Sequence, residues 1–494
     1  MHQNMVLRKL SHLAVSLLVW LSLLAAAVFL RASGLKSVHA AHFAASQPLI
    51  PPNLCSETGP KICYVDKDAP GPSHTGDDWT NALTSLQAAL ELVVDGDQIW
   101  VAAGIYTPTH QILTTDTRSA TFSPVDGVQI YGGFLGNETS LSQRNWRAHP
   151  SILSGDLNGD DVVDTFENNA ENAYHVVTAG NLDKTSTRLD GFILQGGNAN
   201  INNEARKTAY GGGLYNNNNL GSPSMANLIF YKNYALVGGG LYNINADALV
   251  VNVSWIGNQG DFGAAVRNID CSPTLVNALF VGNKAEYVGG AIYNSNGQPN
   301  INNCTAANNS TRRSQDEDGG GGAVFNDKKT HLYLNNCILW GNTSGTDTPD
   351  QVYNEEIPGD LLNSSYTELH SSLYPNGCSG FGSTCYEAEV KTDPLFVNLF
   401  GLDGIIGTLD DNLRLMPGSP AINAGDNTNV GLDDLDINYN GILTETLPYD
   451  LDDARRFVQA VPGYLNFLNH NTPPVVDLGV YEATPILFMP VIRR

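Results

Sequence analysis

Two segments of the sequence place oxygen-bearing side chains at a spacing that suits a calcium ion. The first is a twelve-residue stretch with candidate ligands at its positions 1, 3, 5, 9 and 12, namely Asp156, Asn158, Asp160, Asp164 and Glu167. Calcium takes oxygen ligands, and EF-hand loops present them from alternating positions of one turn. Position 6 is Asp161, where an EF-hand needs glycine. We therefore expect a calcium-binding loop of a β-helix here, with a solvated acidic turn as the alternative.

The second segment repeats this pattern nearer the C-terminus, with the candidate ligands Asp434, Asp436, Asn438, Asn440 and Glu445. Counting from Asp434 puts these side chains at positions 1, 3, 5, 7 and 12. Counting from Asp436 instead puts Gly441 at position 6 but Leu447 at position 12, so the register is ambiguous. The sequence predicts a second calcium loop, and an ordinary acidic turn is again the alternative.

The net charge favours cations as partners. The chain carries 26 basic and 50 acidic residues, a formal charge of −24. Residues 1–40 hold four of the basic residues and no acid, so the rest has 22 against 50, or −28. Such a surface repels nucleic acid and anionic lipid. We therefore predict no nucleic-acid partner.

The N-terminus has the pattern of an export signal. Residues 1–12 are polar and contain Arg8 and Lys9, residues 13–30 form an uninterrupted apolar run, and Val38-His39-Ala40 suits cleavage. A run of 18 residues is near the lower limit for crossing a bilayer, so an uncleaved anchor is the alternative. In either case we predict an exported protein, secreted or held at the cell envelope, that meets a membrane only through this segment.

An internal repeat organises residues 211–345. The phrase GGGLYN ends at Asn216 and Asn243, and its variants GAAVRN, GGAIYN and GGAVFN end at 268, 294 and 326. A second phrase alternates with the first as FYKN, WIGN, FVGN, AANN and LWGN, ending at 233, 258, 283, 309 and 342. Most steps are 25–27 residues long. Two phrases that recur in one register at this period are typical of a solenoid.

Each repeat predicts one coil of an all-β, single-stranded, right-handed parallel β-helix. Glycine pairs suit tight turns, and the alternation after them predicts a strand with an inward and an outward face. The two inward columns are Leu214, Leu241, Val266, Ile292, Val324 and Phe230, Trp255, Phe280, Ala306, Leu339. The outward row is Tyr215, Tyr242, Arg267, Tyr293 and Phe325. The asparagine that closes the first phrase should turn inward at a corner and stack its amide on the next coil.

The alternation of GGA[IVL]-type and FxxN-type phrases resembles the repeats of chlamydial polymorphic outer membrane proteins over roughly residues 211–345. This resemblance implies a β-helix of the pectate-lyase-like superfamily and a surface-exposed, adhesin-like role. The sequence after residue 345 does not resemble the membrane barrel of that family. The resemblance therefore implies the fold but not the family's route of export.

The flanks resemble those of secreted bacterial β-helix proteins. Residues 79–94 carry apolar side chains at helical spacing and predict a helix that covers the open end of the core. Residues 418–425 and 476–482 are similar to the closing coils of that group. We therefore predict four parts: a signal peptide or anchor at 1–40, a segment with the capping helix at 41–96, the β-helix at 97–482 and a tail at 483–494.

The seven cysteines suit an oxidising location in part. Cys55 with Cys63 and Cys378 with Cys385 are close pairs near glycine and proline, as small disulfide loops are. The other three, Cys271, Cys304 and Cys337, lie inside the repeats, where we expect buried free thiols.

Two classes of function follow. The outward row of rings could stack against sugars, or the rings and Arg267 could simply stabilise one another.

The polygalacturonase-like phrases are absent as a set, with Asp410-Asp411 standing alone, and GxSxG, HExxH and Walker motifs are absent. Any chain with 50 acidic residues contains some pair of carboxylates, so a pair alone does not identify a glycosidase. We predict a non-catalytic monomer that contacts glycans or a host or environmental surface. The alternative is a polysaccharide lyase or glycoside hydrolase.

Overall fold

The computed structural model describes Cys55 and residues 60–483, apart from 163, 181, 183–185, 206, 218–221, 318, 356–363, 376–377, 381–382, 386–391 and 458–474. The predicted signal segment and residues 484–494 lie outside this part. Within the described residues, no helix has the length and apolar character needed to span a membrane.

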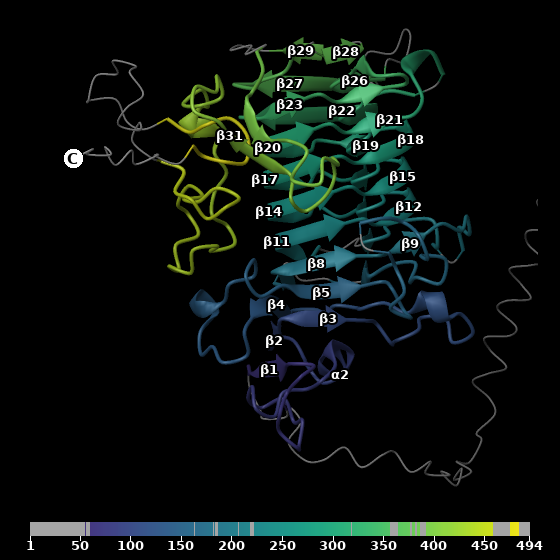
Figure 1. Ribbon diagram of the computed structural model, residues 1–494, viewed down its shortest axis with the longest axis vertical. Helices are drawn as coiled ribbons and strands as arrows, with labels where there is room; N and C mark the ends of the chain where they lie inside the picture. The colour runs from purple at the N-terminus through teal and green to yellow at the C-terminus, as the bar shows by residue number, and fades with distance from the viewer. Residues whose placement is uncertain are drawn as a thin grey trace, which may run out of the picture. The chain divides into compact units, whose positions relative to one another are not determined.

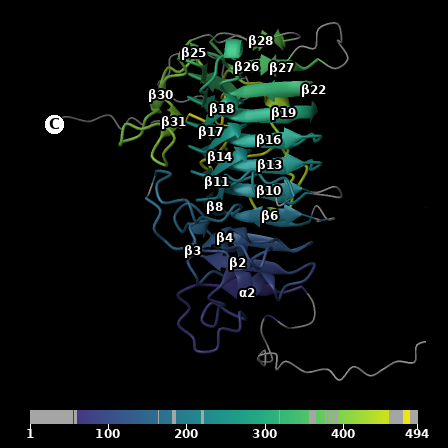
Figure 2. The same cartoon turned by 90° about the vertical axis from the view of Figure 1, so that its right-hand side faces the viewer.

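Each central coil contributes three strands, and each strand pairs in parallel with its counterpart in the next coil (Figures 1 and 2). We call the layers of first, second and third strands sheet 1, sheet 2 and sheet 3. Four coils supply β10 (Leu214–Asn217), β13 (Leu241–Ile244), β16 (Val266–Ile269) and β19 (Ile292–Gly297) to sheet 1; β11 (Ser224–Tyr231), β14 (Leu249–Ile256), β17 (Thr274–Val281) and β20 (Asn300–Ala307) to sheet 2; and β12 (Tyr234–Val237), β15 (Gln259–Phe262), β18 (Lys284–Val288) and β21 (Ser310–Thr311) to sheet 3.

The same layers continue on both sides of these coils. The N-terminal side has β1 (Ile62–Val65), β2 (Gln98–Ala102), β3 (Gly104–Tyr106), β4 (Gln129–Phe134), β5 (Ser151–Ser154), β6 (Val177–Gly180), β7 (Arg188–Asp190), β8 (Phe192–Gln195) and β9 (Asn198–Ala199). The other side has β22 (Val324–Asn335), β23 (Ile338–Trp340), β24 (Thr343–Ser344), β25 (Thr348–Pro349), β26 (Val352–Asn354), β27 (Tyr366–His370), β28 (Cys378–Gly380) and β29 (Ser383–Cys385). The strand β22 runs from sheet 1 into sheet 2. The fold is therefore the predicted parallel β-helix.

The interior columns and the corner asparagines lie where the sequence predicts. Phe230, Trp255 and Phe280 are buried and stack in line, with ring centroids 5.4 and 4.7 Å apart. The closing amides form a ladder from Asn216 to Asn354, each Nδ2 donating to the Oδ1 of the next coil at 2.8–3.0 Å. The asparagines of the second phrase form another ladder at 2.8–3.1 Å. Stacked amides thus satisfy buried polar groups along two corners.

The turn between the third and first strands requires glycine at its first position. The glycine there has a φ between +62° and +69° in each of five coils, at residues 211, 238, 263, 289 and 321. Residues with a side chain rarely adopt this left-handed conformation, which explains why this glycine recurs. The second position of the turn accepts alanine, as Ala264 shows.

The capping helix is shorter than the apolar pattern predicts. The helix α2 spans Leu86–Leu90, and its buried Leu86, Ala89 and Leu90 contact the end of the core. Before it, the backbone NH of Leu83 donates to the carbonyl of Tyr64, so this stretch pairs with β1. Trp79 packs outside the coil against Phe134, at a centroid distance of 5.4 Å. The cap is present, but strand pairing replaces its first turns.

We predicted that the stack of coils continues to residue 482, but the C-terminal residues leave it. They form the antiparallel pair β30 (Phe396–Asn398) and β31 (Asn412–Leu415) and long loops, which pack on the outer face of sheet 2 (Figure 1). The outward side chains there are apolar: Ala226, Val251 and Val276 contact Val430, Ile437 and Val476. We call residues 395–457 and 475–483 the C-terminal cover. An apolar outer face on sheet 2 requires such a cover, which accounts for the difference.

Two of the cysteine predictions have an outcome in the structure. Cys55 and Cys63 form the predicted disulfide. Cys304 and Cys337, which we expected as free thiols, form a second disulfide between β20 and the coil above it. The 33 residues between them equal the step from Asn309 to Asn342, so the two cysteines occupy equivalent places in adjacent coils, with their Cα atoms 4.5 Å apart. Cys271 is a buried free thiol as predicted. The side chains of Cys378 and Cys385 lie outside the described residues.

Candidate functional site

An open groove of about 700 Å³ lies over sheet 3. Its lining comes from five consecutive coils, with Tyr234, Gln259, Lys284, Ser310 and Thr343 at equivalent places. Since neighbouring strands lie about 4.8 Å apart, five coils span roughly 19 Å. The next residue in each strand, such as Ala235, Ala285 or Thr311, points the other way and is buried. The strand alternation thus presents a continuous polar surface long enough for a polymer.

Two carboxylates from adjacent coils line this groove. Asp261 belongs to β15 and Glu286 to β18, and each follows one member of the paired residues Gly260 and Ala285. The register shifts between Gly260 and Phe262, next to Asp261. Such bulges turn side chains away from the regular pleat and are frequent beside active sites.

The surroundings push the two acids in opposite directions. Burial, and then the negative charge of Glu286, raise the pKa of Asp261 above its usual value. Hydrogen bonds from Arg312 lower the pKa of Glu286, whose Oε2 accepts from Arg312 Nε at 2.5 Å. Arg313 Nε lies 3.8 Å from Glu286 Oε1. One acid of the pair therefore retains a proton more readily than the other, which is the division of roles that acid–base chemistry needs.

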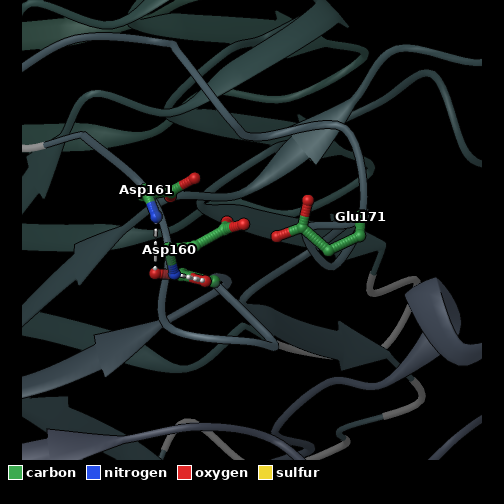
Figure 3. A group of neighbouring side chains, drawn as sticks. Asp160, Asp161 and Glu171 are labelled. Carbon is green, nitrogen blue, oxygen red and sulfur yellow. Dashed lines mark hydrogen bonds between the residues drawn. The ribbon is translucent and has the colours of Figure 1, made fainter.

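The first predicted calcium segment brings together a different set of ligands (Figure 3). Asp156 and Asp160 lie with Asp161 and Glu171, and one carboxylate oxygen of each falls within 4.8 Å of the others. In Figure 3 the carboxylates of Asp160 and Glu171 point toward one another. Burial raises the pKa of Asp161 to about 6, and the neighbouring carboxylates add to this shift.

Two of the other predicted ligands, Asp164 and Glu167, do not belong to this cluster of carboxylates. Asn158 Oδ1 accepts from the backbone NH of Asp160 at 3.1 Å. The carboxylate of Asp164 accepts the hydroxyl of Tyr231, and Glu167 is exposed. Asp161 occupies the position that counted against an EF-hand, and Glu171 follows the predicted loop.

The second predicted segment is closed by its own hydrogen bonds. Asp436 accepts from the backbone NH groups of Asn440 and Gly441, and Glu445 Oε1 accepts from Nδ2 of Asn438 and of Asn440, both at 2.6 Å. Asp434 is exposed. In this arrangement most of the candidate oxygens already serve the loop itself.

The outward row of rings is packed against itself. Tyr215 and Tyr242 stack at a centroid distance of 5.6 Å, and both are buried. The guanidinium carbon of Arg267 lies 3.4 Å from the ring centre of Tyr293. Little ring surface remains for a sugar, so the geometry favours the structural role over the stacking face.

No protein-family model and no curated protein matches the sequence. Among solved structures, the chain is similar to a pectate lyase, with 15% identity and a TM-score of 0.43 over 86% of this chain and 96% of the lyase. It is also similar to a rhamnogalacturonan lyase, with 14% identity and a TM-score of 0.31 over 72% and 96%. A third similar structure is a pectin methylesterase from carrot, with 11% identity and a TM-score of 0.28 over 67% of this chain and 90% of the esterase. At these identities the likeness concerns the fold alone.

Proposed function

We propose that this protein is an exported glycoside hydrolase that cleaves a neutral polysaccharide in the groove over sheet 3. The observation that carries the proposal is the pair Asp261 and Glu286, whose pKa values are shifted in opposite directions. This pair supports the enzymatic alternative of the sequence analysis over the non-catalytic one, because a binding surface needs no such asymmetry.

The roles of the two acids follow from their environments. Asp261 would protonate the glycosidic oxygen as the bond to the anomeric carbon breaks. Glu286, ionised beside Arg312, would attack that carbon and form an ester. Water, deprotonated by Asp261, would then release the sugar. Retaining enzymes need two carboxyl groups roughly 5 Å apart, and side chains from adjacent coils, such as those of Asp261 and Glu286, can reach that separation.

The charge of the groove supports an uncharged substrate. Lys284 and Arg312 stand against Asp261, Glu286 and Asp347, and Arg312 is already engaged by Glu286. Among the described lining residues, three acids outnumber two cations, and this negative balance disfavours the carboxylates of a polyuronate.

Incubation of residues 41–494 with neutral β-glucans, mannans and xylans tests the proposal, with released reducing ends as the readout. We expect Asp261→Asn and Glu286→Gln to reduce the rate at least 100-fold and the exposed control Glu204→Gln to leave it unchanged. Glycan binding without any product would favour the non-catalytic surface role. Absence of both binding and turnover would refute both functions.

We further propose that Asp156, Asp160, Asp161 and Glu171 hold a calcium ion. Four carboxylates that converge within 4.8 Å repel one another, and a divalent cation relieves that repulsion. The proposed export is supported by the disulfides Cys55–Cys63 and Cys304–Cys337, since disulfides persist in oxidising compartments.

A further inference from the structure

The outer face of sheet 2 changes character beyond β17. Along one column of paired residues, Ala226, Val251 and Val276 lie under the C-terminal cover. The same column continues with three polar residues, Asn302, Asn335 and His370. A parallel column ends in Asn300, Tyr333 and Glu368. Their neighbours along the strands, such as Ile301, Leu334 and Leu369, remain in the core, so the change concerns only the outward face.

The polar residues form a network of two hydrogen-bonded groups, one of asparagines and one around Glu368. Asn335 Nδ2 donates to Asn300 Oδ1 at 3.2 Å and to Asn302 Oδ1 at 2.8 Å. Glu368 lies between two imidazoles, with His331 Nε2 at 3.0 Å from Oε1 and His370 Nε2 at 3.5 Å from Oε2. This network fixes the side chains before any ligand arrives, which reduces the entropy lost on binding.

The histidine at the centre of the network is held in one protonation state. Burial lowers the pKa of His331, so the imidazole is neutral near pH 7. Its Nδ1 faces the hydroxyls of Tyr333, at 3.3 Å, and Tyr366. In this arrangement Nε2–H of His331 donates to Glu368 while Nδ1 accepts from a tyrosine, and the carboxylate oxygens of Glu368 keep lone pairs that can accept from another donor.

An open pocket of about 410 Å³ lies over this network. Each lining residue carries a polar group: Gln298, Asn300, Tyr333, Asn335, Glu368, His370 and Asn429. Asn429 comes from the C-terminal cover, where its Nδ2 donates to Asp426 at 3.2 Å. The pocket thus begins where the cover ends, between the coils and the loop that shields the apolar part of the face.

The geometry points to a second saccharide-binding site in this pocket, separate from the groove over sheet 3. Four amides and a carboxylate can donate to and accept from vicinal hydroxyls, and the ring of Tyr333 offers an apolar surface to the face of a sugar. Among the residues that the structure describes, the lining contains no lysine or arginine to balance the charge of an anionic sugar. The ligand class is therefore a neutral saccharide. The site does not depend on hydrolysis elsewhere, and it would hold a polymer chain or branch while the groove acts on another part.

Titration calorimetry on the full chain carrying Asp261→Asn tests this site without turnover. The probes are short neutral glucan, mannan and xylan oligosaccharides, with oligogalacturonate as the anionic arm. We expect one neutral family to bind at two sites. Tyr333→Ala and Glu368→Gln should each weaken one of them at least tenfold, whereas Lys328→Gln, on the same strand, should not. Glu368→Gln is nearly isosteric, so it covers the case in which Tyr333→Ala fails to fold.

Other outcomes would overturn the inference. Binding of oligogalacturonate alone would contradict the neutral ligand, and a single site unaffected by both pocket variants would show that the pocket binds nothing. Reducing-end release by the Glu368→Gln chain with Asp261 intact separates the two proposals. Loss of pocket binding with normal turnover would confirm that the sites are distinct.

Discussion

Arg456 donates from Nη1 to Oε1 of Glu482 at 2.8 Å, and both side chains are buried. Arg456 also bonds to Oδ1 of Asn277 in sheet 2, so the pair joins two ends of the C-terminal cover to the coils. Burial raises the pKa of Glu482 well above its usual value, although Arg456 opposes the shift.

Replacement of Arg456 should therefore unbalance this buried pair. We expect Arg456→Met to lower the free energy of unfolding by about 3–5 kcal/mol at pH 7, because Glu482 is left without a counter-charge. A raised pKa stabilises the folded state at low pH and loses that effect as the pH rises, so the deficit should shrink toward pH 5. Urea unfolding of the variant and the parent chain at pH 5 and pH 7 measures this difference in unfolding free energy. A matched Arg456→Met/Glu482→Leu double variant should recover most of the loss.

The interior stack predicts the largest single loss in the core. Trp255 is fully buried between Phe230 and Phe280, so Trp255→Ala should cost about 3–5 kcal/mol by leaving a cavity. Tyr242→Ala should cost less, since its ring lies outside the coil and neighbouring rings can close over the gap. Chemical denaturation of the two variants compares them directly. Equal losses would show that the outer row contributes as much as the interior stack.

Calcium should raise the melting temperature, and the effect should depend on pH. At an ion concentration a hundredfold above Kd, binding to the folded state alone adds about 2.7 kcal/mol. Asp161 has a pKa of about 6 before an ion binds, so protons compete below that pH and the calcium effect should fade. Differential scanning calorimetry with and without millimolar calcium at pH 5 and 7.5 tests this.

The variants distinguish the two predicted segments. Asp161→Asn and Glu171→Gln should abolish the calcium shift if the four converging carboxylates bind the ion. Asp436→Ala should leave it intact, because Asp436 is not among the carboxylates that converge within 4.8 Å. A shift lost only with Asp436→Ala would instead place the ion at the second segment. Magnesium should do less, since it demands stricter octahedral geometry.

The disulfide between Cys304 and Cys337 should stabilise the upper coils. A crosslink that spans 33 residues is worth about 3–4 kcal/mol in the chain-entropy model. We expect the variant with both residues changed to serine to melt at a lower temperature. A reducing agent should then act on it only through Cys55–Cys63 and the predicted Cys378–Cys385 pair. Mass spectrometry of the unreduced chain should find the Cys304–Cys337 linked peptide. Two free thiols at these positions would contradict the structure.

Repeats made the coils predictable. The spacing of two phrases was enough to predict which side chains point inward, because a coil can stack on its neighbour only in register. A third ladder escaped notice: Asn227, Asn252 and Asn277 lie at the bend of the sheet 2 strands, in left-handed backbone geometry, with amide bonds of 2.7–3.2 Å between coils. Their spacing of 25 residues was visible in the sequence, but the surrounding letters vary more than in the two phrases.

The candidate sites were less accessible to sequence reasoning. Asp261 and Glu286 are also 25 residues apart. In a chain with 50 acidic residues, however, this spacing alone does not identify a site, and the groove and Arg312 become visible only in the structure. Glu171 joins the acidic cluster through a turn that follows the predicted loop. The position of the C-terminal cover depends on contacts more than 100 residues apart in the sequence, such as Asn277 with Tyr449, which no local pattern encodes.

The C-terminal cover also changes how the solenoid should come apart. A stack whose coils touch only their neighbours can fray from either end, one coil at a time. Here the cover bonds to Arg144 near the first coils, to Asn277 in the middle and to Asn336 farther along. Unfolding any of these coils therefore breaks contacts with the same C-terminal cover. The chain from β4 to β22 should unfold as one unit, and its resistance to proteolysis should be lost in a single step.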